Sequence, residues 1–456
     1  MIITPYSQTP GIIWPAIGDS HAAHAMALQY QLEQSQWWDA QDLFTMQMQQ
    51  LSSLLAFAYS NTTFYKNFYS ERGFRPKKIL NAEIWRKIPI VTRHDIQQSE
   101  KELISANFPQ HHGSTFDIST SGSTGRQITV KGSQVTQLFW NAFGLRDHLW
   151  HQRNLRGKLC VIKLAKNNLG KPPNGSLAKH WGSATDAIYK TGPSALLDIS
   201  ATLEEQANWL LHHQPQYLLT YPSNLLALSE YIQQNNIVLP NLLGIRTLGE
   251  IVTPQIRETC NKTWKVPLVD CYSCQEAGYL AIQCPEHDHY HVQSEGVLLE
   301  VLDENDSPCS PGEIGRVLIT SLHNYATPLI RYENGDYAEV GDECSCGRGL
   351  PVLKQIQGRV RNMLLYPNGE KHWPYLGSGW YRETADIQQF QFIQTKLHTI
   401  EVHLVVGNML SSEQENTLKK IIQQSLNYPF NLTFLYHNEI PRSTGGKFED
   451  FISRLV

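Results

Sequence analysis

The sequence lacks the marks of several protein classes. No run approaches about 18 consecutive apolar residues, as a membrane-spanning helix needs, and no basic stretch followed by an apolar one marks a secretory signal near the N-terminus. Neither charge dominates, since 38 Lys and Arg face 42 Asp and Glu for a net charge of -4, so the chain has no general attraction for nucleic acid or anionic lipid. We therefore expect a soluble, cytoplasmic protein that binds neither nucleic acid nor membranes.

Cysteine is also scarce, and its few residues are unevenly spread. Eight cysteines in 456 residues are far too few for a disulfide scaffold. Seven of them lie in one stretch, at Cys260, Cys271, Cys274, Cys284, Cys309, Cys344 and Cys346. In a reducing compartment such bunching indicates metal binding more than disulfides.

The chain has enough hydrophobic residues to form a large core. The chain is 41% hydrophobic and 18% charged, a globular composition rather than a disordered one. Its length predicts about three structural units. Near the start, apolar residues at helical spacing over residues 37–68 predict an amphipathic helical segment.

Short apolar runs alternate with helical stretches between residues 89 and 350. The runs occupy residues 159–164, 216–222, 244–250 and 266–272. Alternation with helical stretches such as 203–212 predicts a mainly parallel sheet with helices on its faces. Residues 296–336 instead read as alternating strands joined by a turn-rich segment, which predicts an antiparallel β subdomain.

The pattern changes again at residues 358–363, and a small α+β unit with a Gly-rich loop follows. We therefore expect an α/β protein with two domains. Residues 1–361 form a large domain with mainly parallel sheets flanked by helices plus the antiparallel subdomain, and residues 362–456 form a small, mobile α+β domain.

Residues 119–126 read Ser-Thr-Ser-Gly-Ser-Thr-Gly-Arg between two apolar runs. Two glycines allow a tight turn with inward N–H groups, and the hydroxyls add donors, which suits a loop wrapped around phosphate oxygens. A polar hairpin tip or flexible linker explains the composition equally well. A Walker A loop does not, because no Gly-Lys-Ser/Thr closes the segment.

This loop resembles the phosphate loop of the adenylate-forming superfamily, which includes acyl-CoA synthetases and nonribosomal adenylation domains. Four further segments that resemble that superfamily follow in its order: Asp-Cys-Tyr-Ser-Cys-Gln-Glu at 270–276, Arg-Tyr-Glu-Asn-Gly-Asp at 331–336, Gly-Arg at 358–359 and Pro-Arg-Ser-Thr-Gly-Gly-Lys at 441–447. Segments at 54–74, 85–96, 321–336 and 344–359 are most similar to the phenylacetate–CoA ligase and capsule-biosynthesis-like branch.

The resemblance implies a role for individual residues. Tyr272 would stack on adenine, Glu276 would hold Mg²⁺, Asp336 would bind the ribose hydroxyls, Arg359 would lie near ribose or phosphate, and Lys447 would touch the carboxylate and α-phosphate. Lys447 and Glu276 are then the catalytic residues. The implied ATP-binding set is Ser119, Thr120, Ser121, Gly122, Ser123, Thr124, Gly125, Gly249, Glu250, Tyr272, Ser273, Asp336 and Arg359.

Each of these residues also has an ordinary explanation. Tyr272 suits a core aromatic, Glu276 a surface carboxylate, Asp336 a turn former and Lys447 a solvated turn. The sequence departs from the superfamily pattern at Cys271 and Cys274, where relatives have Gly and Thr, and at Asn362, where a hinge Asp is usual.

The residue types suit the joining of a carboxylate to ATP. Two anions must meet, so cations and oriented N–H groups are needed where charge develops on the α-phosphate. Mg²⁺ on Glu276, the loop amides and Lys447 would supply them, and a mobile small domain would exclude water from the acyl-adenylate. We expect pyrophosphate release and acyl transfer to a thiol, with CoA favoured.

Two other outcomes stay open. An amine or a carrier protein could accept the acyl group after the same first step, and a nucleotide-binding scaffold without catalysis would keep the same motifs. The helix after the phosphate loop carries Phe139, Trp140 and Phe143, which with Tyr221 would line an acyl pocket for an aromatic or medium hydrophobic acid; such a stripe is also typical of plain core. Whether the chain forms a homodimer is left open.

Cysteines and histidines bunch in two short segments, 284–291 and 344–346. Thiolates and imidazoles from two separated turns are the usual ligands of structural Zn²⁺. The preferred set is Cys284, His291, Cys344 and Cys346, with His287 or His289 as substitutes for His291. Buried cysteines beside a solvated histidine loop are the alternative, and Cys271 and Cys274 are assigned to packing.

Overall fold

The structure is a computed structural model, and it describes residues 4–76, 80–119, 127–374, 381, 384–443 and 445–455. The chain divides into two compact units, Met1–Ile356 and Gln357–Val456. The larger unit holds a mainly parallel sheet and an antiparallel sheet, and the smaller unit holds an α+β fold. Of the helices that the structure describes, none combines the length and apolar character that crossing a bilayer requires.

A six-stranded sheet in the order β4-β5-β3-β6-β7-β8 forms one half of the large unit. All neighbours are parallel except β4, which runs antiparallel to β5. The strands are β3 (Leu159–Lys163), β4 (Ser176–Ala178), β5 (Ser194–Asp198), β6 (Tyr217–Thr220), β7 (Gly244–Thr247) and β8 (Leu268–Val269). The apolar runs of the sequence thus form the predicted parallel strands.

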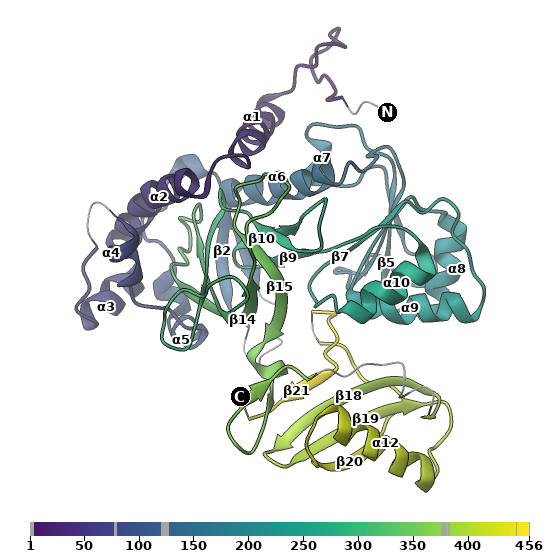
Figure 1. Cartoon of the computed structure of the whole chain (residues 1–456). Coiled ribbons are helices and arrows are strands. Elements are labelled where there is room, and N and C mark those ends of the chain that lie inside the picture. Colours follow the sequence, from purple (N-terminus) through teal and green to yellow (C-terminus); the bar gives the residue numbers. More distant parts are fainter. Residues whose placement is uncertain are drawn as a thin grey trace. The chain divides into compact units, whose positions relative to one another are not determined.

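Three helices pack beside this sheet (Figure 1): α8 (Leu203–His213), α9 (Pro222–Gln234) and α10 (Pro254–Trp264). The hydroxyls of Thr202 and Thr253 accept backbone N–H bonds at the starts of α8 and α10, which satisfies donors that a helix start leaves unpaired. Apolar residues of all three helices share one core with β3, β5, β6 and β7.

A seven-stranded antiparallel sheet in the order β12-β13-β14-β15-β11-β10-β9 forms the other half. Its strands are β9 (Cys271–Cys274), β10 (Gly278–Gln283), β11 (Tyr290–Val292), β12 (Val297–Leu302), β13 (Ile314–Ser321), β14 (Tyr332–Val340) and β15 (Val352–Arg359). This sheet includes the antiparallel subdomain predicted from residues 296–336.

Helices at the start of the chain cover the antiparallel half, as Figure 1 shows for α2 to α5. They are α1 (Ser20–Ser35), α2 (Ala40–Asn61), α3 (Thr63–Glu71), α4 (Ala82–Arg86) and α5 (Arg93–Leu103). The short helix α7 (Ser183–Asp186) occurs farther along the chain and is not part of this group. The amphipathic segment expected over residues 37–68 is interrupted, because Thr62 leaves helical geometry and its hydroxyl caps α3.

A hairpin leads into the most buried helix. Strands β1 (Thr115–Ser119) and β2 (Thr129–Ser133) pair antiparallel, after the short 3₁₀ turn η1 (Gln110–His112). Helix α6 (Gln134–Trp150) starts where Ser133 and Thr136 exchange the two hydrogen bonds of a capping box. Both the predicted phosphate loop and the predicted pocket helix therefore belong to this β1-β2-α6 segment.

The small unit contains a four-stranded sheet with helix α12 (Ser412–Ser425) across it (Figure 1). The sheet order is β20-β19-β18-β21. Its elements are η2 (Val360–Asn362), β16 (Leu364–Leu365), β17 (Lys371–His372), β18 (Ile387–Lys396), β19 (Thr399–Val406), α12 (Ser412–Ser425), β20 (Asn431–Tyr436) and β21 (Phe451–Ser453). Leu418 and Ile422 of α12 pack on Phe392, Ile400 and Val402 of the sheet.

Candidate active site

Two residues predicted to bind the nucleotide meet in the antiparallel sheet. The hydroxyl of Tyr272 donates to Oδ2 of Asp336 at 2.7 Å. Asn334 donates from Nδ2 to the same oxygen at 2.8 Å and to the Tyr272 oxygen at 3.0 Å. Burial and the charge of Asp336 raise the pKa of Tyr272 well above its usual value, so this hydroxyl stays protonated and donates.

A bulge in β14 gives Asp336 its position. The register with β13 passes from Tyr337, opposite Arg316, to Glu333, opposite Leu318, so three residues of β14 face one residue of β13. Gly335 in this bulge has φ 84°, a conformation that glycine adopts without strain. The backbone N–H of Asp336 also donates to Oδ1 of Asn334 at 3.0 Å. The bulge thus turns the Asp336 carboxylate toward Tyr272, although three strands separate β14 from β9 in the sheet order.

Glu276 lies in the turn between β9 and β10 and is only 8% exposed. Its negative charge, added to burial, raises the pKa of the Tyr332 hydroxyl, and Arg93 opposes that shift. Arg93, at the start of α5, donates to the same hydroxyl at 3.5 Å. Glu276 and Tyr332 therefore lie close in sequence to Tyr272 and Asp336, and Arg93 of α5 contacts the Tyr332 hydroxyl from outside the sheet.

The remaining predicted nucleotide residues are more scattered. Gly249 follows β7 with φ 79°, and Oε2 of Glu250 accepts a hydrogen bond from the backbone N–H of Ser223 at 2.8 Å, in the first turn of α9. Glu250 thus pairs with a helix start, where a carboxylate is favourable. Ser273 is half-buried in β9.

The phosphate loop itself falls almost wholly outside the described residues. This applies to Thr120, Ser121, Gly122, Ser123, Thr124 and Gly125. Ser119, which is described, ends β1, and its Oγ lies 3.4 Å from Oγ1 of Thr129 across the hairpin. The two strands that frame the loop are thus paired up to the last residue before it.

Arg359 and Lys447 belong to the smaller unit. The Arg359 backbone N–H donates to Asn362 at 3.3 Å, where the sequence places Asn in the position of the usual hinge Asp. The Lys447 backbone N–H donates to Oγ of Ser443 at 3.2 Å, and its carbonyl accepts from the Ser443 N–H at 2.8 Å. These bonds close the C-terminal loop that carries Lys447.

Three of the four predicted pocket residues line one small pocket that is partly open to solvent. Its lining comprises Thr136, Phe139, Trp140, Phe143, Ala277, Gly278, Tyr279, Gly296, Ser321 and His323. The Phe139 ring stacks on His323 with centroids 3.9 Å apart, and Trp140 meets Tyr279 edge to face at 5.4 Å. Tyr221, the fourth predicted residue, instead packs in the core of the six-stranded sheet.

Small residues shape this pocket. A side-chain Cβ at Gly296 would come within 2.5 Å of the Phe143 ring, so only glycine lets the ring approach. Residues Ala277, Gly278 and Tyr279 follow Glu276 directly and form the wall opposite α6. The segment from Tyr272 to Tyr279 therefore connects the candidate nucleotide residues with the pocket.

His323 is the one imidazole on the pocket wall among the described residues. Its Nε2 lies 2.8 Å from the backbone carbonyl oxygen of Glu295, which requires that this nitrogen carry the proton. Burial lowers the pKa of His323 to about 4. At neutral pH the ring is uncharged, and Nδ1 is a hydrogen-bond acceptor.

A second polar cluster joins the two sheets and was not predicted. Asp147 on α6 is fully buried and forms ion pairs with Arg153 at 2.9 Å and with Arg246 of β7 at 2.8 Å. Arg246 also donates to the Tyr279 hydroxyl of β10 at 2.7 Å. Burial favours the neutral acid, yet the two arginines hold the pKa of Asp147 well below its usual value.

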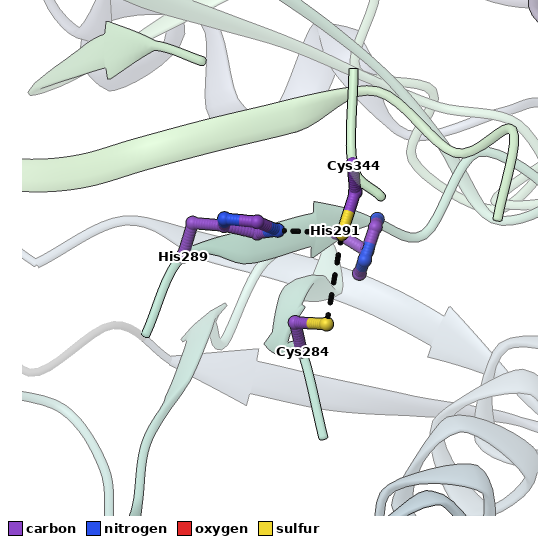
Figure 2. Close-up of side chains that lie close together, drawn as sticks. All are labelled: Cys284, His289, His291 and Cys344. Carbon is purple, nitrogen blue, oxygen red and sulfur yellow. Dashed lines mark hydrogen bonds between the residues drawn. The ribbon is translucent and has the colours of Figure 1, made fainter. Parts of the chain in front are cut away.

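Figure 2 shows a cluster of cysteine and histidine side chains from the β10-β11 turn and the β14-β15 loop. One donor atom from each of Cys284, His289, His291 and Cys344 lies within 4.8 Å of the others. His289 thus joins the group where the preferred set from sequence had Cys346. Cys346 is nearby, with Sγ 3.4 Å from Nε2 of His291. His287 is exposed and contacts the Ser345 hydroxyl at 3.0 Å.

The other cysteines of the bunched stretch pack in the interior. Cys271 is 4% exposed, and burial raises the pKa of its thiol to about 12. Cys274 packs against the large core, and Cys260 is a buried residue of α10, where burial raises the pKa of its thiol to about 11. A buried, protonated thiol behaves as a small apolar group, and the packing role predicted for Cys271 and Cys274 agrees with their core contacts.

Sequence reasoning missed Asn334 and Arg93. Asn334 binds both Tyr272 and Asp336, and it lies inside the quoted segment 331–336, so its position was available as a signal. Arg93 lies in the segment 85–96 that carried part of the resemblance. Arg331, by contrast, pairs with Glu300 at 3.1 Å and binds backbone carbonyls at 2% exposure, so it supports the fold.

Comparison with known proteins finds relatives that agree with one another in kind. Residues 378–454 match the family model of the CapK C-terminal domain. The chain is 23% identical to Protein CapK of Staphylococcus aureus over 90% of its length and 89% of that protein. It is 25% identical to a phenylacetate-coenzyme A ligase of Thermus thermophilus, with 71% of this chain and 72% of that protein covered.

A solved structure resembles almost the whole chain. It is 2-hydroxyisobutyryl-CoA ligase in the postadenylation state in complex with R3-HIB-AMP, with a TM-score of 0.71 at 16% identity, covering 93% of this chain and 92% of that one. The homologues are therefore CapK and phenylacetate-coenzyme A ligases, and the fold is that of adenylate-forming ligases with a small C-terminal domain. This confirms the resemblance and the fold class predicted from the sequence.

Proposed function

We propose that this chain, a homologue of CapK and of the phenylacetate-coenzyme A ligases, activates a carboxylic acid with ATP and transfers the acyl group to CoA. The first step forms an acyl-adenylate as the carboxylate oxygen attacks the α-phosphorus and pyrophosphate leaves. In the second step the CoA sulfur attacks the acyl carbon and AMP leaves. The observation that carries the proposal is the segment from Tyr272 to Tyr279, which joins the Asp336 cluster, Glu276 and an apolar pocket.

Asp336 and Tyr272 are the residues for the nucleoside. The Asp336 carboxylate accepts two hydrogen bonds at Oδ2, from Tyr272 and Asn334, which fixes its orientation. A carboxylate so held accepts hydrogen bonds from two neighbouring ribose hydroxyls. The Tyr272 ring is anchored at its hydroxyl and is 8% exposed within the large core, so adenine would stack on the part of the ring that stays accessible.

Glu276, Lys447 and the loop over residues 119–125 are the residues for the phosphates. A carboxylate that is nearly buried suits one or two contacts to Mg²⁺ carried by ATP. Bound Mg²⁺ would offset phosphate charge, and the Lys447 ammonium would stabilise the charge that develops on the α-phosphate. Residues 362–456, which carry Lys447, act as the lid that excludes water from the adenylate.

The pocket suggests the class of acid. Phe139, Trp140, Phe143 and Tyr279 offer ring faces and edges, which favour a flat aromatic or medium hydrophobic acid. The neutral His323 adds one acceptor at Nδ1 to this wall. An acid with a hydroxyl or amine that reaches this nitrogen gains a hydrogen bond that its apolar analogue lacks, and a site built for such a bond discriminates against the analogue.

The test is carboxylate-dependent ATP–pyrophosphate exchange with a panel of aromatic and aliphatic acids. Exchange should appear with at least one acid, and Lys447→Ala should lower its rate about 100-fold or more, because it removes a transition-state contact. Lys420→Ala, an exposed lysine on α12 in the same unit, is the matched control and should retain full rate. Absence of exchange with every acid would instead support a nucleotide-binding scaffold.

The acceptor is identified by the product. Addition of CoA to the active acid should release AMP and yield the acyl-CoA, seen by mass. If an amide with an added amine, or an acylated carrier protein, forms in place of the thioester, that acceptor replaces CoA in the proposal. The first step, adenylation, is then still supported.

A further inference from the structure

We propose that Cys284, His289, His291 and Cys344 bind one structural Zn²⁺ that fastens the β10-β11 turn to the β14-β15 loop (Figure 2). The site lies apart from the residues assigned to ATP and acid, and it does not depend on the proposed activity. Two thiolates and two imidazoles form a common closed set for structural zinc. The chain brings these donors together from positions 60 residues apart.

The spacing of the donor atoms fits tetrahedral coordination. With Zn–S bonds of about 2.3 Å, the two sulfurs of such a site lie about 3.8 Å apart. The Sγ atoms of Cys284 and Cys344 lie 3.8 Å apart. Nε2 of His289 lies 3.0 Å from the Cys344 sulfur, whereas a zinc site spaces sulfur and nitrogen about 3.5 Å apart. The four donor atoms lie within 4.8 Å of one another, so binding needs side-chain shifts of about 1 Å, among them an outward shift of the half-buried His289 imidazole.

The backbone already holds each donor in place. The Cys284 N–H donates to the carbonyl of His289 at 2.8 Å, which closes the turn and sets the two residues side by side. His291 is fully buried, and its Nδ1 lies 3.3 Å from the carbonyl oxygen of Leu350. That bond places the proton on Nδ1 and leaves the Nε2 lone pair for the metal, the usual arrangement of a metal-binding histidine.

Backbone N–H groups also point at both sulfurs. The Glu286 N–H donates to Cys284 Sγ at 3.5 Å, and the Cys346 N–H donates to Cys344 Sγ at 3.4 Å. Such bonds stabilise a thiolate once a metal has displaced its proton. Cys346 is the competing fifth donor, because its Sγ lies 3.4 Å from Nε2 of His291 and Arg348 also donates a hydrogen bond to it.

The loop that carries Cys344 supports the junction between α1 and α2. The Gly349 N–H donates to the carbonyl of Gln36 at 3.0 Å, and a Cβ on Gly349 would lie 1.7 Å from the Trp38 carbonyl oxygen. The Arg348 guanidinium lies over the ring of Trp37 at 4.7 Å and over that of Trp150 at 4.5 Å. Zinc that fixes this loop would therefore also fix the N-terminal segment that packs on it.

The first experiment measures metal in the purified full-length chain. We expect one zinc per chain in the unaltered protein, and loss of zinc in Cys344→Ser and His289→Ala. Cys309→Ser, a partly buried cysteine outside the cluster, is the matched control and should retain zinc, as should Cys346→Ser. A folded, metal-free protein overturns the site. Zinc that survives His289→Ala but not Cys346→Ser overturns the ligand set and returns it to the one with three cysteines.

The second experiment needs no destabilising variant. Zinc in the unaltered chain is exchanged for Co²⁺, whose visible spectrum reports tetrahedral geometry and whose near-ultraviolet charge-transfer bands report bound thiolates. We expect a tetrahedral spectrum with the charge-transfer intensity of two thiolates. Proteolysis between residues 36 and 39 should become faster when chelator removes the metal. An octahedral spectrum without thiolate bands, or cleavage unaffected by the chelator, contradicts the proposal.

Discussion

The larger unit holds two polar clusters that are each centred on an aspartate and differ in what surrounds it. In one, Asp336 at a strand bulge accepts hydrogen bonds from Tyr272 and Asn334 and remains partly exposed. In the other, Asp147 is fully buried between Arg153 and Arg246. Strong electrostatic perturbation is often a sign of a functional site, yet the carboxyl group whose pKa is held well below its usual value, that of Asp147, belongs to the buried cluster.

The difference follows from location. The buried ion cluster connects α6 to β7 and, through Tyr279, to β10. Its charged groups therefore interact with one another between the two sheets instead of with water. The Asp336 cluster keeps a carboxylate oriented at a bulge, where a ligand can still reach it. We infer that the first cluster supports the fold and the second binds nucleotide, and the same substitutions made in both should separate these roles.

The largest effect is expected for Asp147→Asn. Loss of this charge leaves two buried arginines without their counter-ion, which typically lowers the free energy of unfolding by about 3–5 kcal/mol. Urea denaturation at pH 7 measures it. Asp117→Asn is the matched control, because Asp117 pairs with Lys131 at 2.8 Å on the surface, and such a pair contributes about 1 kcal/mol or less. An Asp147 variant as stable as the control would remove the distinction between the clusters.

The same substitution at Asp336 should act on activity. Asp336→Asn keeps the size of the side chain and removes the charge, so we expect the KM for ATP to rise about 10- to 100-fold, the loss expected for hydrogen bonds to a charged group, with little change in stability. Initial rates of pyrophosphate exchange at varied ATP measure the KM, and urea denaturation measures the stability. Unchanged KM with lowered stability would make Asp336 a turn former.

Much of the fold was predictable because local chemistry agrees with the tertiary structure. The strands at β3, β6, β7 and β8 follow from apolar runs, and α8 begins at a capping threonine. The break between α2 and α3 was missed, since apolar spacing continues through it while the Thr62 hydroxyl ends one helix and caps the next. A single side-chain cap changes the backbone without changing the hydrophobic pattern.

The site divides along similar lines. Tyr272, Glu276 and Asp336 could be predicted as site residues because each lies in a short contiguous motif. The bulge that turns Asp336, and the exchange of Cys346 for His289 in the cysteine and histidine cluster, depend on register and on turn closure. Asp147 and Arg246 are 99 residues apart along the chain with no motif around either. Only the packing of α6 against β7 brings them together.

A pH measurement tests whether His323 on the pocket wall, like Asp147 in the buried cluster, has a pKa shifted by its surroundings. Burial lowers the pKa of His323 from 6.5 to about 4, so between these values the unfolded chain binds a proton that the folded chain does not. The free energy of unfolding should therefore fall as pH decreases through this window, by about 1–2 kcal/mol at pH 5 from this group. His323→Gln should show a correspondingly smaller fall between pH 7 and pH 5 in urea denaturation. Equal falls in both proteins would mean that His323 titrates normally.

The smallest effects are expected from removal of one hydroxyl in each cluster. Tyr279→Phe loses the hydrogen bond to Arg246 and should lower the free energy of unfolding by about 1 kcal/mol without changing the KM for ATP. Tyr272→Phe keeps the ring and loses the bond to Asp336, so the KM for ATP should rise about 3- to 10-fold. Both variants are measured by urea denaturation and by exchange at varied ATP. If Tyr279→Phe alters the ATP KM as much as Tyr272→Phe does, the two clusters are coupled and the buried one also serves the nucleotide site.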